Sequence, residues 1–212
     1  MFDRTALERP AIDIAPRLLG AILTKRSIEG TVSVRITEVE AYLGAFDPGS
    51  HAFRGQTKRN AVMFGEPGFL YTYFTYGMHV CANVVCSPPG TASAVLLRAG
   101  EVIEGGDLAR SRRSTSRTHA DLARGPARLV VALGITLGDG GADLAASPFE
   151  LTLTDEPPDF DAGVRTGVSG DGGTAAYPWR FWIPGDPTVS PYKAAARPNG
   201  NSGKRSPVPP VL

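Results

Sequence analysis

Cysteine is scarce in this sequence, and long apolar segments are missing. Cys81 and Cys86 are the two cysteines among the 212 residues. Their spacing of five along an extended strand places them on opposite faces, so we expect no disulfide between them. Asp3, Glu8 and two prolines interrupt the region where a signal peptide needs an unbroken apolar stretch, and no apolar run approaches membrane-spanning length. We therefore expect a soluble, cytoplasmic protein with reduced thiols.

Positive charge is absent from one long stretch of the chain. Residues 129–164 hold seven Asp or Glu and no Lys or Arg, whereas residues 110–128 hold six arginines and one acid, although the net charge is only +1. This asymmetry predicts a dipolar molecule in which the arginine-rich strip lies next to the basic segment 54–60 and follows a phosphate backbone. The alternative is an ordinary solvated loop over 110–118.

The length and the pattern of turn residues predict one domain. A chain of 212 residues can bury a core without metal or disulfide support. The expected elements are a helix over 12–26 interrupted by Pro16, strands over 31–43, 94–99, 149–155 and 179–185, a hairpin over 69–86 with Tyr76 at its tip, and a helix over 125–135 with Pro126 in its first turn. They indicate an α+β domain over residues 1–195, with a mainly antiparallel, curved sheet, flanking helices and a protruding hairpin. The Pro-, Gly- and Ser-rich residues 196–212 are expected to be a disordered tail.

One face of the strand expected over 31–43 changes character along its length. Every second residue from Val32 is apolar at first, but the same face ends in Glu38, Glu40 and Tyr42. A carboxylate in that position lies either at a solvent-exposed sheet end or in a pocket where its basicity is useful. The pattern leaves both interpretations open.

Metal binding and nucleophilic catalysis are the other chemistries to weigh. Asp47 and His51 follow Glu40 closely, but the three residues match no ligand motif, so we expect no metal. A Ser or Cys nucleophile is not indicated either, because the chain has no nucleophile elbow and both cysteines fall inside a predicted strand.

The predicted hairpin carries two unusual side chains. Tyr71 and Tyr73 alternate with Thr72 and Phe74, a pattern that is typical of side chains packed in a sheet. Tyr76 at the tip has no local surface to bury against and is available to enter a partner, as wedge residues do in proteins that kink nucleic acids. Asn83 stands in the apolar run of the return strand, so its amide needs a hydrogen-bond partner, either backbone or the edge of a ligand.

Several linked segments resemble the alkyladenine (3-methylpurine) DNA glycosylase family in order and spacing. The resemblance covers about residues 10 to 193. The segments that carry it are TEVEAYLG, SHAFRGQTKRNAVMFGEPGFLYTYFTYGMHVCANVV, AVLLRAGEVIEG, ARGPARLVVALGI and WRFWIPGDPTVS. So many segments in the same order make the match specific. It implies a monofunctional, monomeric enzyme without a cofactor, which acts on damaged purines in double-stranded DNA.

The resemblance also implies roles for individual residues. Glu40 is implied as the general base for the attacking water, and Arg98 and the Val189 carbonyl as the groups that hold that water. Tyr42, His51 and Tyr73 are implied as the walls that stack on a flipped base. Asn83 is implied as the group that excludes guanine, and Tyr76 as the intercalating residue. Lys58, Arg59, Arg112 and Arg113 are the expected contacts to the DNA backbone. On this interpretation the strand turns polar at Glu38 because its end forms the floor of a base pocket. None of the four lysines stands out as a pocket residue, which favours direct attack by water over a Schiff base.

Two departures from the family pattern qualify these roles. Lys58 replaces a proline, which adds a phosphate contact, and residues 169–177 are richer in glycine than the family's usual segment. Two alternative functions stay open. One is a catalytically silent protein that binds damaged DNA, and the other is an enzyme that acts on free nucleosides or on another formyl- or glycosyl-type substrate.

Overall fold

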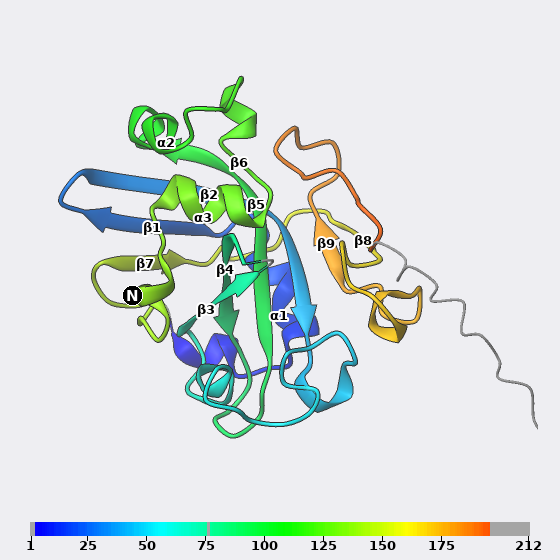
Figure 1. Ribbon diagram of the computed structural model, residues 1–212. Coiled ribbons are helices and arrows are strands. Elements are labelled where there is room, and N and C mark those ends of the chain that lie inside the picture. The colour runs from blue at the N-terminus through cyan, green and yellow to red at the C-terminus, as the bar shows by residue number, and fades with distance from the viewer. Residues whose placement is uncertain (1–2, 76, 196–212) are drawn as a thin grey trace, which may run out of the picture.

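An antiparallel sheet dominates the computed structural model, which describes residues 3–75 and 77–195 (Figure 1). The strands are β1 Ile22–Ser27, β2 Gly30–Tyr42, β3 Leu70–Thr75, β4 His79–Val85, β5 Ala94–Glu104, β6 Ala123–Arg124, β7 Phe149–Thr152, β8 Asp161–Gly163 and β9 Arg180–Trp182. The α-helices are α1 Ala11–Leu18, α2 Gly106–Arg112 and α3 Pro126–Leu133, and the 3-10 helices are Arg4–Leu7, Gly44–Phe46, Ala61–Phe64, His119–Asp121, Leu137–Asp139 and Asp171–Gly173.

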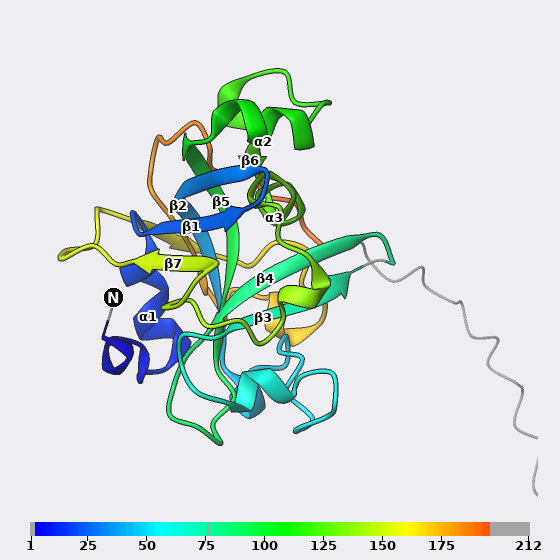
Figure 2. The same ribbon diagram turned by 90° about the vertical axis from the view of Figure 1, so that its left-hand side faces the viewer.

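The central strands of the sheet carry the core. The strand order is β3-β4-β5-β2-β1-β7, with β6 beside β5, and β9 pairs both β2 and β8. α1 and α3 lie on either side of β2 and β5 (Figures 1 and 2). α1 buries Ala11, Ile14, Ala15 and Leu18, the spacing of one helix face. The predicted α+β class with a mainly antiparallel sheet is therefore confirmed.

The prediction of a helix over 12–26 is wrong in its second half. α1 ends at Leu18, after which Leu19 is extended and Gly20 has a φ of 81°. Glycine adopts that left-handed conformation without strain, so the chain turns there. Residues 22–27 form β1, which pairs with β2 on one edge and β7 on the other. The β1 side chains therefore pack within a sheet rather than along a helix.

The predicted hairpin over 69–86 is confirmed. β3 and β4 pair from Leu70↔Val84 to Thr75↔His79, and Figure 2 shows the pair extending away from the body of the molecule. Tyr76 and the proposed tail over 196–212 lie outside the described residues. Cys81 and Cys86 on β4 are both free and buried. α3 also begins as predicted, with Pro126 in its first turn.

The two basic segments are not adjacent, contrary to the sequence-based expectation. Both views place α2 and the chain that follows it at one end of the molecule and the loop after β2 at the other, with the β3–β4 hairpin between them (Figures 1 and 2). Residues 110–112 are helical rather than part of a loop. In the described part of the chain no helix is long and apolar enough to cross a membrane.

Candidate active site

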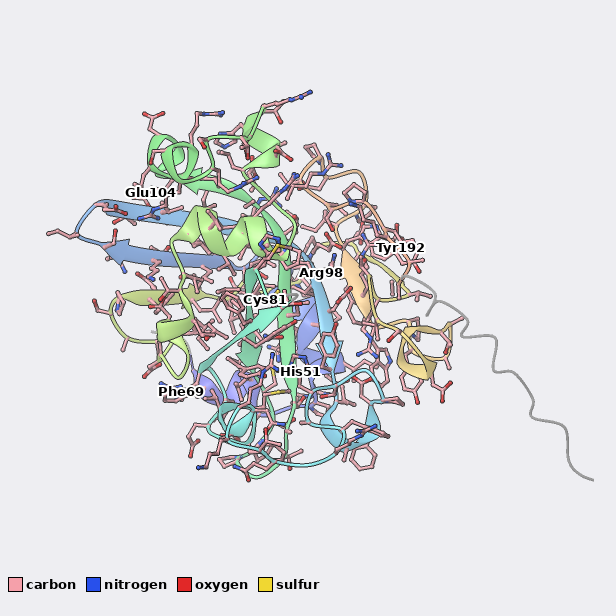
Figure 3. The ribbon with its side chains drawn as sticks, in the orientation of Figure 1. His51, Phe69, Cys81, Arg98, Glu104 and Tyr192 are labelled. Carbon is pink, nitrogen blue, oxygen red and sulfur yellow. The ribbon has the colours of Figure 1, made fainter. Side chains whose placement is uncertain are left out.

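A cavity of about 570 Å³ opens where β2, β4 and β5 meet the loop after β2. That volume is within the range of small-molecule sites. Its lining includes Glu40, Tyr42, His51, Tyr73, Asn83 and Arg98, the six cavity residues that the family resemblance implies, together with Arg59, Cys81 and Thr166. Figure 3 shows Arg98, Cys81 and His51 following one another through the centre of the molecule.

Glu40 has its carboxylate held by two hydrogen bonds and one ion pair. Its Oε1 accepts a hydrogen bond from the backbone N–H of Thr166 at 2.6 Å and lies 3.2 Å from Nη1 of Arg98. Its Oε2 accepts from the Tyr42 hydroxyl at 2.8 Å. The side chain is fully buried, so its polar contacts are made in a medium of lower dielectric constant than water.

Arg98 reaches Glu40 because of an irregularity in the sheet. The β2–β5 register pairs Glu38 with Ala99 and Val39 with Leu97, which leaves Arg98 as an extra residue on β5. Such a bulge re-aims the side chain it carries. Burial alone would lower the pKa of Arg98, but the charges of Glu40 and Glu38 raise it above its usual value. The guanidinium is therefore a permanent cation between two carboxylates.

Glu38 has a different environment from Glu40. Its Oε1 accepts from Nε of Arg98 at 2.9 Å and from Nε of Arg180 at 2.6 Å, and its Oε2 accepts from the Ser190 backbone N–H at 2.7 Å. Burial would raise the pKa of Glu38, but the charge of Arg98, the Ser190 bond and Arg180 together lower it. Glu38 does not line the cavity. Glu40 and Tyr42, further along β2, do line it, so the end of the strand borders the cavity while Glu38 lies behind it.

Aromatic side chains stand around the cavity. The His51 ring meets the edge of Tyr73, with 4.4 Å between ring centroids, and its Nδ1 lies 3.2 Å from the Tyr71 hydroxyl. Burial, and then the charge of Arg59, lower the pKa of His51, which favours the neutral form of the imidazole. Burial, and then Glu40, raise the pKa of Tyr42 well above its usual value, so its hydroxyl keeps the proton that it donates to Glu40.

Asn83 has the backbone partner that the apolar run requires. Its Nδ2 donates to the Tyr71 carbonyl at 3.1 Å, across the β3–β4 pair. Only 4% of the residue is exposed, and it lines the cavity. The amide is thus fixed in one orientation at the wall of the cavity.

Val189 is half-buried and is not part of the cavity lining. Its carbonyl accepts a hydrogen bond from Nε of Arg124 at 2.8 Å. The water-holding role implied for this carbonyl stays a prediction.

The four proposed DNA-backbone residues differ in their surroundings. Lys58 is exposed, and Arg59 borders the cavity while donating to the Phe74 carbonyl. Arg112 instead pairs with Glu29 and donates to the Ala132 carbonyl, and Arg113 donates to the Leu122 carbonyl. Contact with DNA stays a prediction for all four residues.

Asp47 belongs to an ion pair rather than to a metal cluster. Both of its carboxylate oxygens accept from Arg165, each at 2.6 Å. No group of three His, Cys, Asp or Glu residues in the described chain has an arrangement that could hold a metal ion. Reasoning from the sequence missed Arg165, which binds Asp47, and its neighbour Thr166, which lines the cavity and donates to Glu40.

Comparisons with known proteins show the family of the chain. The family model described as methylpurine-DNA glycosylase (MPG) matches residues 5–187. A protein of Leifsonia xyli subsp. xyli named "Putative 3-methyladenine DNA glycosylase" is 63% identical over 195 residues, which cover 90% of this chain and 92% of the relative. Proteins of the same name from Streptomyces avermitilis and Nocardia farcinica are 56% and 52% identical, each over 202 residues that cover 91% of this chain and 94% and 92% of the relative. The chain therefore belongs to the methylpurine-DNA glycosylase family.

Proposed function

We propose that this protein is a base-excision-repair glycosylase that flips an alkylated or deaminated purine out of duplex DNA and hydrolyses its N-glycosidic bond with an activated water. Its substrates are bases of the 3-methyladenine, 7-methylguanine, hypoxanthine and ethenoadenine type. It acts as a monomer in the cytoplasm and needs no cofactor. The observation that carries the proposal is Glu40, a buried carboxylate held by two hydrogen bonds and one ion pair at the wall of a cavity with aromatic sides.

The chemistry follows from the position of that carboxylate. A water oxygen forms a bond to C1′ of the sugar, its proton passes to Glu40, and the bond from C1′ to the base nitrogen breaks with its electron pair leaving on the base. The sugar gains positive charge in the transition state, and the Glu40 anion stabilises that charge. Arg98 sits 3.2 Å from Glu40 and helps to orient the water. The Val189 carbonyl keeps a second lone pair for the same water beside its bond to Arg124.

The aromatic walls offset the cost of removing a base from the duplex. Unstacking and unpairing cost a few kcal/mol, least for a damaged base. Stacking of the extruded purine on Tyr42, His51 and Tyr73 returns about 1–3 kcal/mol per base. On this proposal Tyr76 fills the gap in the stack, and Lys58, Arg59, Arg112 and Arg113 bind phosphates on either side of the hairpin.

The nature of the leaving group decides what else is needed. An alkylated purine already carries positive charge and departs as a neutral base, whereas hypoxanthine must gain a proton as it leaves. No lysine is found among the described residues that line the cavity. This supports direct attack by water rather than a Schiff base with the sugar.

The test compares three substrates with wild-type protein: a duplex with one hypoxanthine, the matched undamaged duplex, and free inosine. Release of hypoxanthine is followed directly, and the abasic site is detected by alkaline strand cleavage. We expect release from the lesion duplex alone. Tight binding to that duplex without release would instead identify a silent damage-binding protein, and hydrolysis of inosine alone would identify a nucleoside hydrolase.

A further inference from the structure

Arg165 is the largest fully buried side chain in the described structure, at 1% exposure, and it lies beside the cavity without lining it. Its two terminal nitrogens bind the Asp47 carboxylate and also donate to the carbonyls of Ala41 and Gly172, at 2.9 and 2.7 Å. The bonds join three separate parts of the chain: the end of β2, the loop after it, and the segment 165–174. That segment supplies a wall of the cavity through residues 166–169.

The guanidinium also supports an aromatic wall from behind. It lies 4.5 Å from the ring centroid of Tyr42 and 5.2 Å from that of Trp179, a distance at which a cation is attracted to an aromatic face. Tyr42 lines the cavity and Arg165 does not. Arg165 therefore contacts a wall residue of the cavity without itself taking part in the lining.

The backbone next to Arg165 fixes the reactive carboxylate. Thr166 follows Arg165 directly, and its N–H donates to Oε1 of Glu40 at 2.6 Å. A shift of the Arg165 backbone would therefore move the donor that orients Glu40. The glycines of this segment allow the close packing that holds it in place. A Cβ on Gly172 would lie 2.5 Å from the Gly49 nitrogen, and a Cβ on Gly49 would lie 2.6 Å from Nη2 of Arg165.

A buried ion pair is a costly way to stabilise a fold, because the desolvation of two charges offsets much of their attraction. Its main effect is the geometry that it imposes. We infer that Arg165 is a positioning residue: through Asp47, Tyr42 and the Thr166 N–H it sets the geometry of Glu40 and of the base-stacking wall. This inference rests on the proposed function for its consequence in catalysis, whereas its structural part concerns the Thr166–Glu40 bond alone.

The test uses Arg165→Met, the conservative Arg165→Lys, and Lys25→Met as a matched control. Lys25 forms another largely buried ion pair, with Asp139 at 2.7 Å, and does not line the cavity. Two readouts are compared below the melting temperature of each variant. The first readout is the hydrogen-exchange rate of the Thr166 amide, with the amide of the core residue Val34 as reference. The second is the rate of single-turnover hypoxanthine release, together with the protein concentration that gives half of the maximal rate.

We expect Arg165→Lys to speed Thr166 exchange about tenfold while Val34 is unchanged. Its single-turnover rate should fall by about tenfold or more at an unchanged half-saturation, since an ångström of misplacement costs about a hundredfold. The single-turnover rate of Arg165→Met should fall further than that of Arg165→Lys, and Lys25→Met should lower only the melting temperature. Should Arg165→Met fail to fold, Arg165→Lys decides alone.

Three outcomes for Arg165→Lys would overturn the inference. The variant behaves like Lys25→Met; or exchange of the Thr166 amide becomes faster while the rate of hypoxanthine release is unchanged; or the rate of release falls while Thr166 exchange is unchanged. If the wild-type protein releases no base at all, the proposed function fails separately. Thr166 exchange then decides whether Arg165 positions Glu40.

Discussion

Glu38 and Glu40 lie two residues apart on β2, and their different hydrogen-bond and ion-pair partners give them different roles. Glu38 is bound by Arg98, Arg180 and the Ser190 backbone inside the protein, whereas Glu40 faces the cavity and is bound by one guanidinium, one phenol and one amide. At the scale of single residues, Glu38 therefore stabilises the fold and holds Arg98, and Glu40 is left to react.

Glu38→Gln should lower the free energy of unfolding at pH 7 by about 3 kcal/mol, because it leaves buried arginine charge without its partner. The pKa of Glu38 is lower in the folded protein than its ordinary value of 4.5. The stability that its charge contributes is therefore fully present above about pH 4.5 and is lost as the pH falls through the folded-state pKa. Urea unfolding of both proteins should show a difference that narrows in acid, and a difference that is constant with pH would contradict this account.

Asn83→Ser should raise the excision of guanine-type bases relative to hypoxanthine. The Asn83 amide is fixed by the Tyr71 carbonyl, and on our proposal it meets the 2-amino group of guanine, which hypoxanthine lacks. The clash costs guanine about 1–3 kcal/mol. Each 1.4 kcal/mol relieved should raise the ratio of guanine-type to hypoxanthine excision about tenfold. The ratio of single-turnover rates on matched duplexes measures this. A flat or falling ratio would leave Asn83 as a structural residue of the hairpin.

Among the elements, the β3–β4 hairpin leads to the next prediction. Tyr76 falls between Thr75 and the exposed residues Gly77 and Met78. Tyr76→Ser should weaken binding to lesion DNA by about 1–3 kcal/mol, the value of one stacking interaction. We expect the melting temperature to stay the same. A large fall in melting temperature with unchanged DNA affinity would mean that Tyr76 packs in the core.

Strongly patterned elements could be predicted from the sequence, and irregular ones could not. The hairpin over 69–86 and the helix that begins at Pro126 follow from local residue types. β1 could not be separated from the preceding helix, because its apolar spacing fits both structures over so short a run. The β5 bulge that aims Arg98 depends on the pairing of two distant strands, which no local pattern encodes.

The candidate site was predictable to the extent that family motifs carry it. Glu40, Tyr42 and Asn83, which the resemblance singles out, line one cavity, and their roles stay predictions. The Arg165–Asp47 pair joins residues 118 positions apart, and in sequence a buried arginine resembles a surface one. The paired roles of Glu38 and Arg180 were hidden for the same reason.

For the molecule as a whole, the distribution of basic residues governs contact with DNA. Arg59 borders the cavity and makes one hydrogen bond, to the Phe74 carbonyl, and Lys58 precedes it on the exposed loop. Arg112 pairs with Glu29 and donates to the Ala132 carbonyl, and Arg113 donates to the Leu122 carbonyl. Replacing Lys58 and Arg59 by alanine should reduce the slope of log affinity against log salt by up to about two units at an unchanged melting temperature. Replacing Arg112 and Arg113 should reduce the slope less and lower the melting temperature. Equal slopes for the two double variants would contradict this ranking and show that Arg112 and Arg113 contribute as much to phosphate binding as Lys58 and Arg59.

The central claim is that Glu40 activates the attacking water, and Glu40→Gln tests it most directly. The amide keeps the shape of the side chain and an acceptor for the Thr166 N–H, but it cannot take a proton. Single-turnover release of hypoxanthine should fall by about 10² to 10⁴-fold or more, while affinity for the lesion duplex stays close to that of the wild type. A variant that binds the duplex and keeps more than about a tenth of the wild-type rate would contradict the claim.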